Sequence, residues 1–486
     1  MRTIPATSRR KFLPVLIAGA LAPGLAAAAT APSSSDTPYL VSLDAGVDFT
    51  SLLTAGDTVR RMHKGNLDYA MVGIPDGLGA WDNGDGTITV LMNQELGSSL
   101  GVIRDHGGKG AFVSRWQVRK SDLKVLAGED QIKDVRLWNG TAFAPAAGVI
   151  FNRFCSADLP ASTALYNRDS GKGLADGRLF LNGEETAAGR AMAHVATGRD
   201  HGTSYELPRF GRAAWENLIA SPFEQDKTIV AGDDDGPLNG SKVYFYVGQK
   251  QASGSPVDQA GLNNGSTWQL SVTGYATESA GTPIPNGYSG RFNLGAAGTG
   301  FNRVEDGAWD TVNPNRYYFV TTASFTGNTR LWRLTFDDIH HPEGGGNIQI
   351  LVDGAVTGQK MLDNITVDRD GNVYMLEDVG NQPHLGRIWE YSAANGTTRL
   401  LAQHDPLRFI AGAPADIDGS DSKQSDEESS GIVDLSALFD GVPGYDTVHN
   451  NYLLLDVQAH YTSVNGVPVP VAQVEGGQLL LMRASR

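Results

Sequence analysis

Short apolar runs separated by glycine, asparagine and aspartate recur along the whole of this 486-residue chain, and they constrain its fold more than any other feature. The runs are rich in the β-branched and aromatic residues that strands prefer, and most are too short for an ordinary buried helix. D-G and N-G dipeptides between runs, as in NGDGT and DRDGN, are typical of hairpin turns. We therefore predict strands at 86–95, 177–185, 242–248, 316–325, 329–336, 371–379, 386–392 and 451–458.

The arrangement of these strands points to one fold class. No Pro/Ser-rich linker divides the chain, so a single domain of residues 30–486 is expected. A long all-β chain without a linker fits a β-propeller, in which four-stranded sheets surround a central channel, and we expect about six blades. Helical patterning is weak, and we expect short helical insertions at 210–220 and 430–440.

Acids and amides follow several of the predicted strands. They are Asn93, Glu95, Glu184, Glu185, Glu377, Asp378 and Asp456. Equivalent strands of different blades run in the same direction along a propeller channel, so side chains at equivalent positions converge at one mouth. Strands also end at polar turns for no functional reason, which explains any single case. The recurrence favours a metal site built from several carboxylates.

Cys155, in NRFCSADLP, is the only cysteine of the chain, so no intrachain disulfide can form. A free cysteine is most often a small buried hydrophobe. Its polar neighbours, Asn152, Arg153, Ser156 and Asp158, favour a second interpretation, in which the thiolate is a metal ligand.

Arg303 and Glu305 are two residues apart in FNRVEDGAWD, so on a strand their side chains share a face. A guanidinium beside a metal-binding carboxylate suits phosphoryl transfer, because the metal takes one oxygen and the arginine fork holds others. A surface ion pair is the equally simple alternative.

The N-terminus predicts export. TSRRKFL contains Arg9 and Arg10, an apolar run follows, and small residues offer a cleavage site near Ala28–Thr30. The Ser-Arg-Arg-x-Phe-Leu core indicates a twin-arginine leader over 1–29, which implies a folded, periplasmic or extracellular protein that carries a cofactor through the twin-arginine translocase. No other segment is apolar enough to anchor the chain in a membrane.

Charge and motifs exclude several classes. The formal net charge is −15 at pH 7, which disfavours nucleic acid and anionic lipid as partners. G-x-S-x-G, H-E-x-x-H and the P-loop are absent, which argues against serine hydrolases, zincins and NTPases. Two acidic stretches, Asp233–Asp235 and Asp416–Gly431, are weaker calcium candidates and do not match EF-hand spacing.

Seven stretches, in the same order, resemble the PhoX-type alkaline phosphatases, which are exported by the twin-arginine route. They are LMNQEL, NRFCSADLP, RLFLNGEET, RFGRAAWENL, FNRVEDGAWD, LDNITVDRDGNVYMLED and LLDVQAHY. The chain departs from the family pattern at Gln94, Gly183 and Trp215, where the family has histidine, cysteine and histidine.

The resemblance implies a six-bladed propeller that hydrolyses phosphate monoesters with iron and calcium ions. Arg303 would bind phosphate. Metal ligands implied at matching positions are Cys155, Glu216, Glu305 and Asp378, with Asn93, Glu95, Glu184 and Glu185 as further candidates and Asp363, Asn364, Asp456 and His460 as weaker ones.

Two alternatives remain open, and a monomer is expected in each case. One is a calcium-dependent propeller hydrolase of another substrate, such as a lactone or a phytate-like polyphosphate. The other is an exported propeller that binds a ligand without catalysis, with acids that only order its loops.

Overall fold

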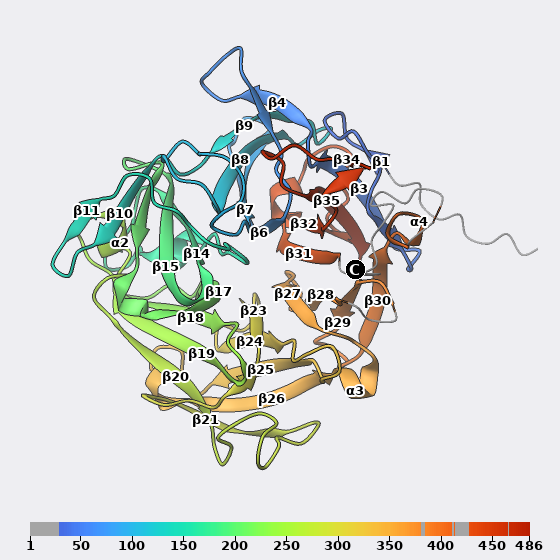
Figure 1. Ribbon diagram of the computed structural model, residues 1–486. Helices are drawn as coiled ribbons and strands as arrows, with labels where there is room; N and C mark the ends of the chain where they lie inside the picture. The colour runs from blue at the N-terminus through green and yellow to red at the C-terminus, as the bar shows by residue number, and fades with distance from the viewer. Residues whose placement is uncertain (1–28, 381–383, 411–412, 414–426, 465) are drawn as a thin grey trace, which may run out of the picture.

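Six blades surround a central channel, and three of them are joined edge to edge in one 15-stranded sheet, which confirms the predicted fold class (Figure 1). The computed structural model describes residues 29–380, 384–410, 413, 427–464 and 466–486. The predicted leader, except Ala29, and most of the acidic stretch Asp416–Gly431 lie outside these residues. Within them, no helix is long and apolar enough to cross a membrane.

Each blade is a meander of four antiparallel strands, and its first strand lies at the channel. The first blade contains β6 (Pro75–Asp82), β7 (Thr87–Gln94), β8 (Phe112–Arg119) and β9 (Val125–Asp130), extended by β4 (Thr58–Arg61) and β5 (Asp68–Ala70). The third contains β17 (Arg212–Ala220), β18 (Lys227–Asp234), β19 (Leu238–Gln249) and β20 (Ser266–Val272). The fourth contains β23 (Val304–Trp309), β24 (Arg316–Thr321), β25 (Arg330–Phe336) and β26 (Gly346–Asp353). β21 (Ser289–Gly295) pairs with both β20 and β26, and β22 (Phe301–Asn302) pairs with β19.

The second blade differs at the channel. Its innermost strand is irregular and consists of residues 154–158, which form bridges from Phe154 to Glu184 and from Asp158 to Leu181. The blade continues with β14 (Arg178–Gly183), β15 (Glu185–Thr197) and β16 (Thr203–Glu206), and β10 (Asp134–Trp138) and β11 (Phe143–Pro145) extend its outer edge. The only cysteine therefore lies in a channel-lining segment.

Strands from the two ends of the chain close the ring. The fifth blade contains β27 (Leu362–Val367), β28 (Val373–Glu377), β29 (Arg387–Tyr391) and β30 (Thr398–His404), completed by β2 (Leu40–Ser42). The sixth contains β31 (Glu428–Asp434), β32 (Asn450–Ala459), β35 (Gly476–Ser485) and β3 (Val47–Thr54), with β1 (Ala29–Thr30) at its edge. Because β3 pairs with β35, hydrogen bonds between early and late residues hold the ring together.

The remaining elements are short. Two small hairpins consist of β12 (Tyr166–Asn167) with β13 (Lys172–Gly173) and β33 (Ser463–Val464) with β34 (Val467–Pro468). The helical turns are α1 (Ser162–Leu165), α2 (Pro256–Gln259), α3 (Gly354–Thr357), α4 (Pro406–Phe409), η1 (Pro208–Phe210), η2 (Pro342–Gly344) and η3 (Ser436–Phe439).

A separate apolar cluster fills each of the six interfaces between neighbouring blades. Trp116 and Leu454, for example, belong to the cluster between the first and sixth blades, and Tyr318 and Met375 to the one between the fourth and fifth. Most strands are therefore buried on both faces, which explains why they are continuous apolar runs rather than alternating patterns.

The two predicted helical insertions are largely wrong. Residues 212–220 form β17, and residues 428–434 form β31, followed by the single 3-10 turn η3. Both strands are innermost strands, and their apolar residues pack on two sides, so RAAWENLIA lacks the alternation of a half-buried strand. Tertiary packing thus overrides local propensity.

Candidate metal centre

Each of five innermost strands carries a carboxylate of the site, and Cys155 lies in the innermost segment of the remaining blade. The five are Asp76 (β6), Glu216 (β17), Glu305 (β23), Asp363 (β27) and Glu428 (β31). Equivalent strands run in the same direction, so these six side chains meet at one mouth of the channel. Glu95 and Asp378 join them from positions directly after the second strands β7 and β28, and Glu185 joins them as the first residue of β15.

These nine residues form what we call the acid–thiol cluster. The cluster consists of four groups of three residues. Within each group, one ligand atom per residue lies within 4.8 Å of the others, and the groups overlap at Cys155, Glu216 and Asp363. The groups are Asp76–Glu95–Cys155, Cys155–Glu185–Glu216, Glu216–Glu305–Asp363 and Asp363–Asp378–Glu428. Shared members make one continuous arc around the mouth.

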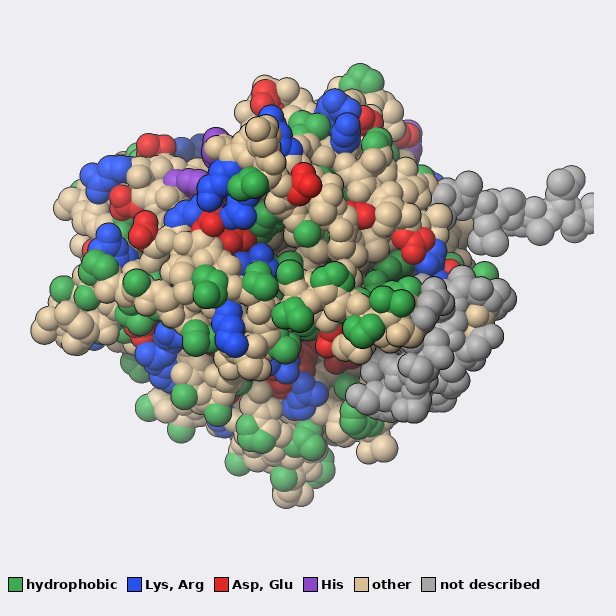
Figure 2. Space-filling model, turned by 45° about the horizontal axis from the view of Figure 1, so that its top comes forward, with side chains coloured by type: hydrophobic (Ala, Val, Ile, Leu, Met, Phe, Trp, Pro, Cys, Tyr) green, Lys and Arg blue, Asp and Glu red, His purple; other side chains and the backbone are tan. Residues whose placement is uncertain are grey.

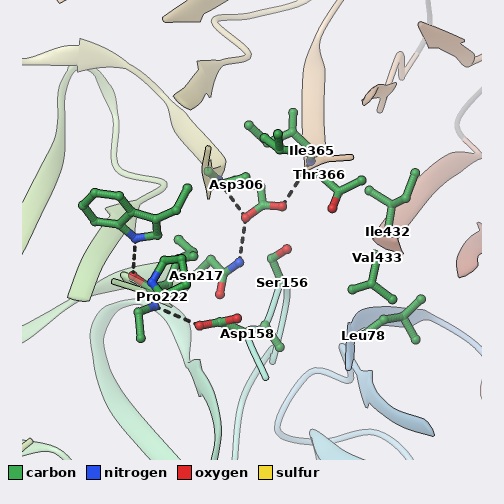
Figure 3. A pocket seen from close by; sticks show the side chains of 18 of the residues that line it. Leu78, Ser156, Asp158, Asn217, Pro222, Asp306, Ile365, Thr366, Ile432 and Val433 are labelled. Atoms are coloured by element: carbon green, nitrogen blue, oxygen red, sulfur yellow. Dashed lines mark hydrogen bonds between the residues drawn. The ribbon is translucent and has the colours of Figure 1, made fainter. Parts of the chain in front are cut away.

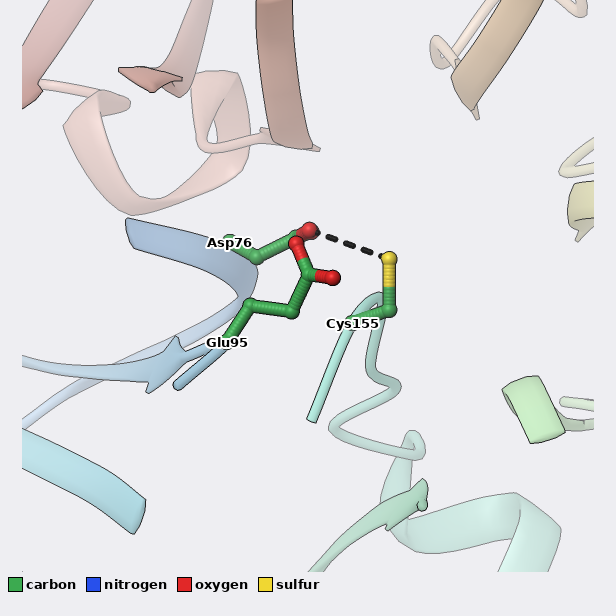
Figure 4. Close-up of side chains that lie close together, drawn as sticks. All are labelled: Asp76, Glu95 and Cys155. Atoms are coloured by element: carbon green, nitrogen blue, oxygen red, sulfur yellow. Dashed lines mark hydrogen bonds between the residues drawn. The ribbon is translucent and has the colours of Figure 1, made fainter. Parts of the chain in front are cut away.

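Cys155 points into this arc. Its Sγ donates a hydrogen bond of 3.2 Å to Oδ2 of Asp76, beside Glu95 (Figure 4). Burial, and then the carboxylates of Asp76 and Glu216, raise the pKa of the thiol. A thiol with a raised pKa loses its proton only when a cation compensates the charge, which is what a metal ion does.

Two buried oxygen atoms show that the cluster fits cations. Oε2 of Glu216 and Oδ1 of Asp363 have no hydrogen-bond partner among the described residues. Burial is the main cause that raises the pKa of both carboxyls, and neighbouring acids add to it. Buried carboxylates without partners are costly, and a bound cation removes that cost.

Arg303 lies at the edge of the cluster with its guanidinium held in place. Nε and Nη2 donate to the two carboxylate oxygens of Asp235 at 2.9 and 2.7 Å, and Nη2 lies 2.9 Å from Oε1 of Glu305. Its side chain remains 34% exposed. A guanidinium held in this way still has N–H donors on Nη1 available for an anion at the mouth.

The other predicted site residues lie outside the four groups. Asn93 Nδ2 donates to the backbone oxygen of Cys155 at 2.6 Å, and thus positions the cysteine. Glu184 is paired with Arg190, and Asn364 donates to Ser156 Oγ. His460 Nδ1 lies 2.8 Å from Oε2 of Glu475.

Asp456 is a special case among these outlying residues. It is fully buried in β32, and neither of its carboxylate oxygens has a hydrogen-bond partner among the described residues. Burial, followed by the charge of Asp76, raises its pKa well above the usual value. A protonated carboxyl is what such surroundings favour.

Sequence reasoning missed three acids of the site. Asp76 lies at the start of an innermost strand, whereas we searched for acids at strand ends. Asp235 and Glu428 were seen only within the acidic stretches Asp233–Asp235 and Asp416–Gly431. Gln458 was also missed, although its Nε2 donates to Oε2 of Glu95 at 2.8 Å and to Oδ2 of Asp76 at 3.2 Å. The signal for Asp76 was the sequence IPDG, which has turn-forming residues at the start of β6.

Below the cluster, a cavity of about 180 Å³ lies inside the ring of innermost strands (Figure 3). Residues adjacent in sequence to cluster members line it, including Ser156, Asn217 and Asp306. Oδ1 of Asp306 accepts from Asn217 Nδ2 at 2.6 Å, and burial raises its pKa to about 6. Burial raises the pKa of Asp158, on the opposite wall, to about 7.

The space-filling view shows acidic and basic side chains together in the hollows of the surface (Figure 2).

Comparisons with known proteins find similarity in structure but none in sequence. No protein-family model matches the chain, and no curated protein is significantly similar to it. PhoX from Pseudomonas fluorescens, solved in complex with vanadate, a transition state analogue, superposes with a TM-score of 0.61 and 11% identity over 94% of this chain and 97% of that one. At this identity the likeness concerns the fold. The chain has a PhoX-like propeller fold.

Two further structures are more distant. A Xanthomonas campestris gluconolactonase has a TM-score of 0.31 with 10% identity, over 86% of this chain and 87% of its own. A Penicillium chrysogenum α-L-arabinanase has a TM-score of 0.40 with 9% identity, over 84% and 93% of the two chains. Both scores are too low to indicate a close relationship.

Proposed function

We propose that this protein is a metal-dependent phosphatase that hydrolyses phosphate monoesters at the mouth of the propeller channel. The acid–thiol cluster, with Arg303 fixed at its edge, is the observation that carries the proposal. The PhoX-like fold supports it, because the same arrangement of blades in that protein accepts vanadate. We further propose that the folded protein is exported through the twin-arginine translocase to the periplasm or cell exterior as a monomer.

The donor set suggests which cations the cluster takes. Thiolate is a soft ligand that suits iron, and carboxylates suit calcium and ferric iron. Cys155, Glu216 and Asp363 would hold ions that are shared between neighbouring groups. Bound metal ions supply charge stabilisation for a phosphoryl group and an activated oxygen nucleophile.

The residues of the chain then position the ester. The Arg303 fork binds non-bridging phosphoryl oxygens, and Asp235 and Glu305 hold that fork in a single orientation. Nε and Nη2 are engaged by Asp235 and Glu305, so Nη1 is left to donate to these oxygens. Charge that develops on the oxygens in the transition state strengthens the hydrogen bonds from Nη1, which lowers the barrier. The arginine is charged at every relevant pH, so its contribution does not titrate.

The first test is turnover itself. Purified protein containing iron and calcium is expected to release phosphate from an aryl phosphate monoester at alkaline pH, measured by phosphate release alongside elemental analysis. Hydrolysis of a lactone or of phytate instead, together with calcium as the only metal, would support the calcium-dependent alternative. Binding without turnover of any of these substrates would support a non-catalytic propeller.

Two adjacent acids provide a matched pair of variants. Glu185 belongs to the acid–thiol cluster, whereas Glu184 is neutralised by Arg190 outside it. Glu185→Gln is expected to lower metal content and to reduce kcat by at least about tenfold, as loss of a metal-site group does. Glu184→Gln is expected to lower stability by about 1–3 kcal/mol while metal content stays unchanged, because it breaks a buried pair away from the metals. Equal metal content in both variants would contradict the assigned cluster.

A further inference from the structure

Four innermost strands enter the mouth through the same unusual backbone turn. Ile74, Arg153, Arg303 and Met361 each have a positive φ, of 52°, 49°, 57° and 44°. Each lies two residues before a cluster member: Asp76, Cys155, Glu305 or Asp363. Left-handed backbone is uncommon for residues other than glycine and concentrates at functional sites. Arg153 in the second blade is therefore the structural equivalent of Arg303 in the fourth.

The side chains at these four positions differ in exposure. Ile74 and Met361 are buried, whereas the side chains of Arg153 and Arg303 are 49% and 34% exposed. Arg153 Nη2 lies 2.6 Å from Oε1 of Glu95, and the guanidinium also donates to Glu185. Each arginine is thus held by two carboxylates and keeps one side open to the mouth.

Both guanidinium groups act on one site but from different places. Glu185, which holds Arg153, and Glu305, which holds Arg303, belong to neighbouring groups of the cluster that share Glu216. Asp235 and Glu305 hold Arg303, whereas Glu95 and Glu185 hold Arg153, so the two arginines share no ion-pair partner. The two forks therefore address different parts of a ligand bound between them.

Charge balance alone does not account for Arg153. Arg190, which neutralises Glu184, has an ordinary backbone conformation, and its side chain is only 17% exposed. A residue that only neutralises buried acids does not need a guanidinium that is half exposed at the mouth. We infer that Arg153 binds a second anionic group of the substrate, distinct from the phosphoryl group held at Arg303, and that the preferred substrates are phosphoesters whose alcohol carries a carboxylate or another phosphate. This inference rests on the proposed function for the role of Arg303.

Binding of two non-hydrolysable probes tests the inference without relying on turnover. Phosphonoacetate carries a phosphonate and a carboxylate, and ethylphosphonate carries the phosphonate alone. Calorimetry on the purified metal-containing protein is expected to show about tenfold tighter binding of phosphonoacetate, the gain typical of a charged hydrogen bond. Arg153→Gln should abolish this preference and leave the affinity for ethylphosphonate within about twofold. Arg153→Lys should keep part of the preference, and Arg190→Lys should keep all of it.

The outcomes separate three explanations. Equal weakening of both probes in Arg153→Gln, as expected for Arg303→Gln, would show that Arg153 holds the same phosphoryl group and would overturn the inference. A wild-type protein without any preference would also overturn it. Metal content and melting temperature of each variant show whether the cluster is intact. If the preference is found but an aryl phosphate is not hydrolysed, the second anion site is supported and the phosphatase proposal fails.

Discussion

Cys155→Ser is expected to abolish the visible absorption of the purified protein and to lower its phosphatase kcat by at least about 100-fold. A thiolate bound to ferric iron absorbs visible light by charge transfer, and a serine hydroxyl is a poor replacement for a soft anionic sulfur. Substitution of a residue that contacts a metal ligand typically lowers metal affinity or activity by about 10- to 100-fold, so loss of a ligand itself should lower activity at least as much. Cys155 belongs to two of the four groups, so its loss affects both. Absorption spectra, iron analysis and kcat are measured on the same preparation.

Stability provides the control for this substitution. If Cys155 were only a buried hydrophobe, serine would cost about 1–2 kcal/mol through the buried hydroxyl and would leave kcat per folded molecule unchanged. Asp76 accepts from the thiol and would also accept from the hydroxyl, which limits that cost. Arg303→Ala is the matched variant, because it should reduce phosphate binding and keep the colour. A colourless wild-type protein, or full specific activity in Cys155→Ser, would remove iron from the proposal.

The sequence was sufficient for the fold class because of how a propeller buries its strands. Interfaces between blades cover both faces of most strands, and the resulting apolar runs, such as TITVLM in β7 and NYLLL in β32, stand out between polar turns. The same double burial removed the alternation that would have marked β17 and β31 as strands. One physical cause therefore explains both the correct and the wrong assignments.

The candidate site was predictable in part. Acids after second strands, such as Glu95 and Asp378, were found because a polar residue directly after an apolar run is conspicuous. Asp76 and Glu428 precede their runs, where an acid reads as part of a turn. Arg153 could not be singled out, since its importance depends on a left-handed φ and on carboxylates far away in the sequence.

One departure from the PhoX-type pattern has a steric reason in this backbone. A Cβ added at Gly183 would lie 2.3 Å from the Cβ and 2.9 Å from the Cγ of the buried Trp215, so a side chain does not fit at 183 without a shift of the neighbouring strand. The contact lies next in sequence to Glu216, so the departure falls beside the cluster and leaves its carboxylates in place.

Removal of metal ions is expected to lower the melting temperature by several degrees, and the loss should grow as the pH rises. An ion held at 100 times its Kd stabilises the folded state by about 2.7 kcal/mol, and several ions add their contributions. Without ions, burial is the main cause that raises the pKa of Glu216, Glu305 and Asp363 above their usual values of 4.5, 4.5 and 3.8. Differential scanning calorimetry with and without a chelator measures the difference.

The direction of the pH effect follows from these raised pKa values. A carboxyl whose pKa is raised by folding stabilises the fold while it is protonated, and this contribution is lost as the pH rises through the folded-state pKa. Metal-free protein should therefore become less stable as the pH rises above the ordinary carboxyl range, toward the raised pKa values of the folded state. Metal ions bind deprotonated ligands, so their stabilisation increases over the same range. The difference in melting temperature between the metal-containing and the metal-free protein should increase with pH, and Glu216→Gln should reduce this increase. A difference in melting temperature that stays constant from pH 5 to pH 8 would place the ions away from the acid–thiol cluster, because the buried carboxyls and the thiol of the cluster must release protons when ions bind.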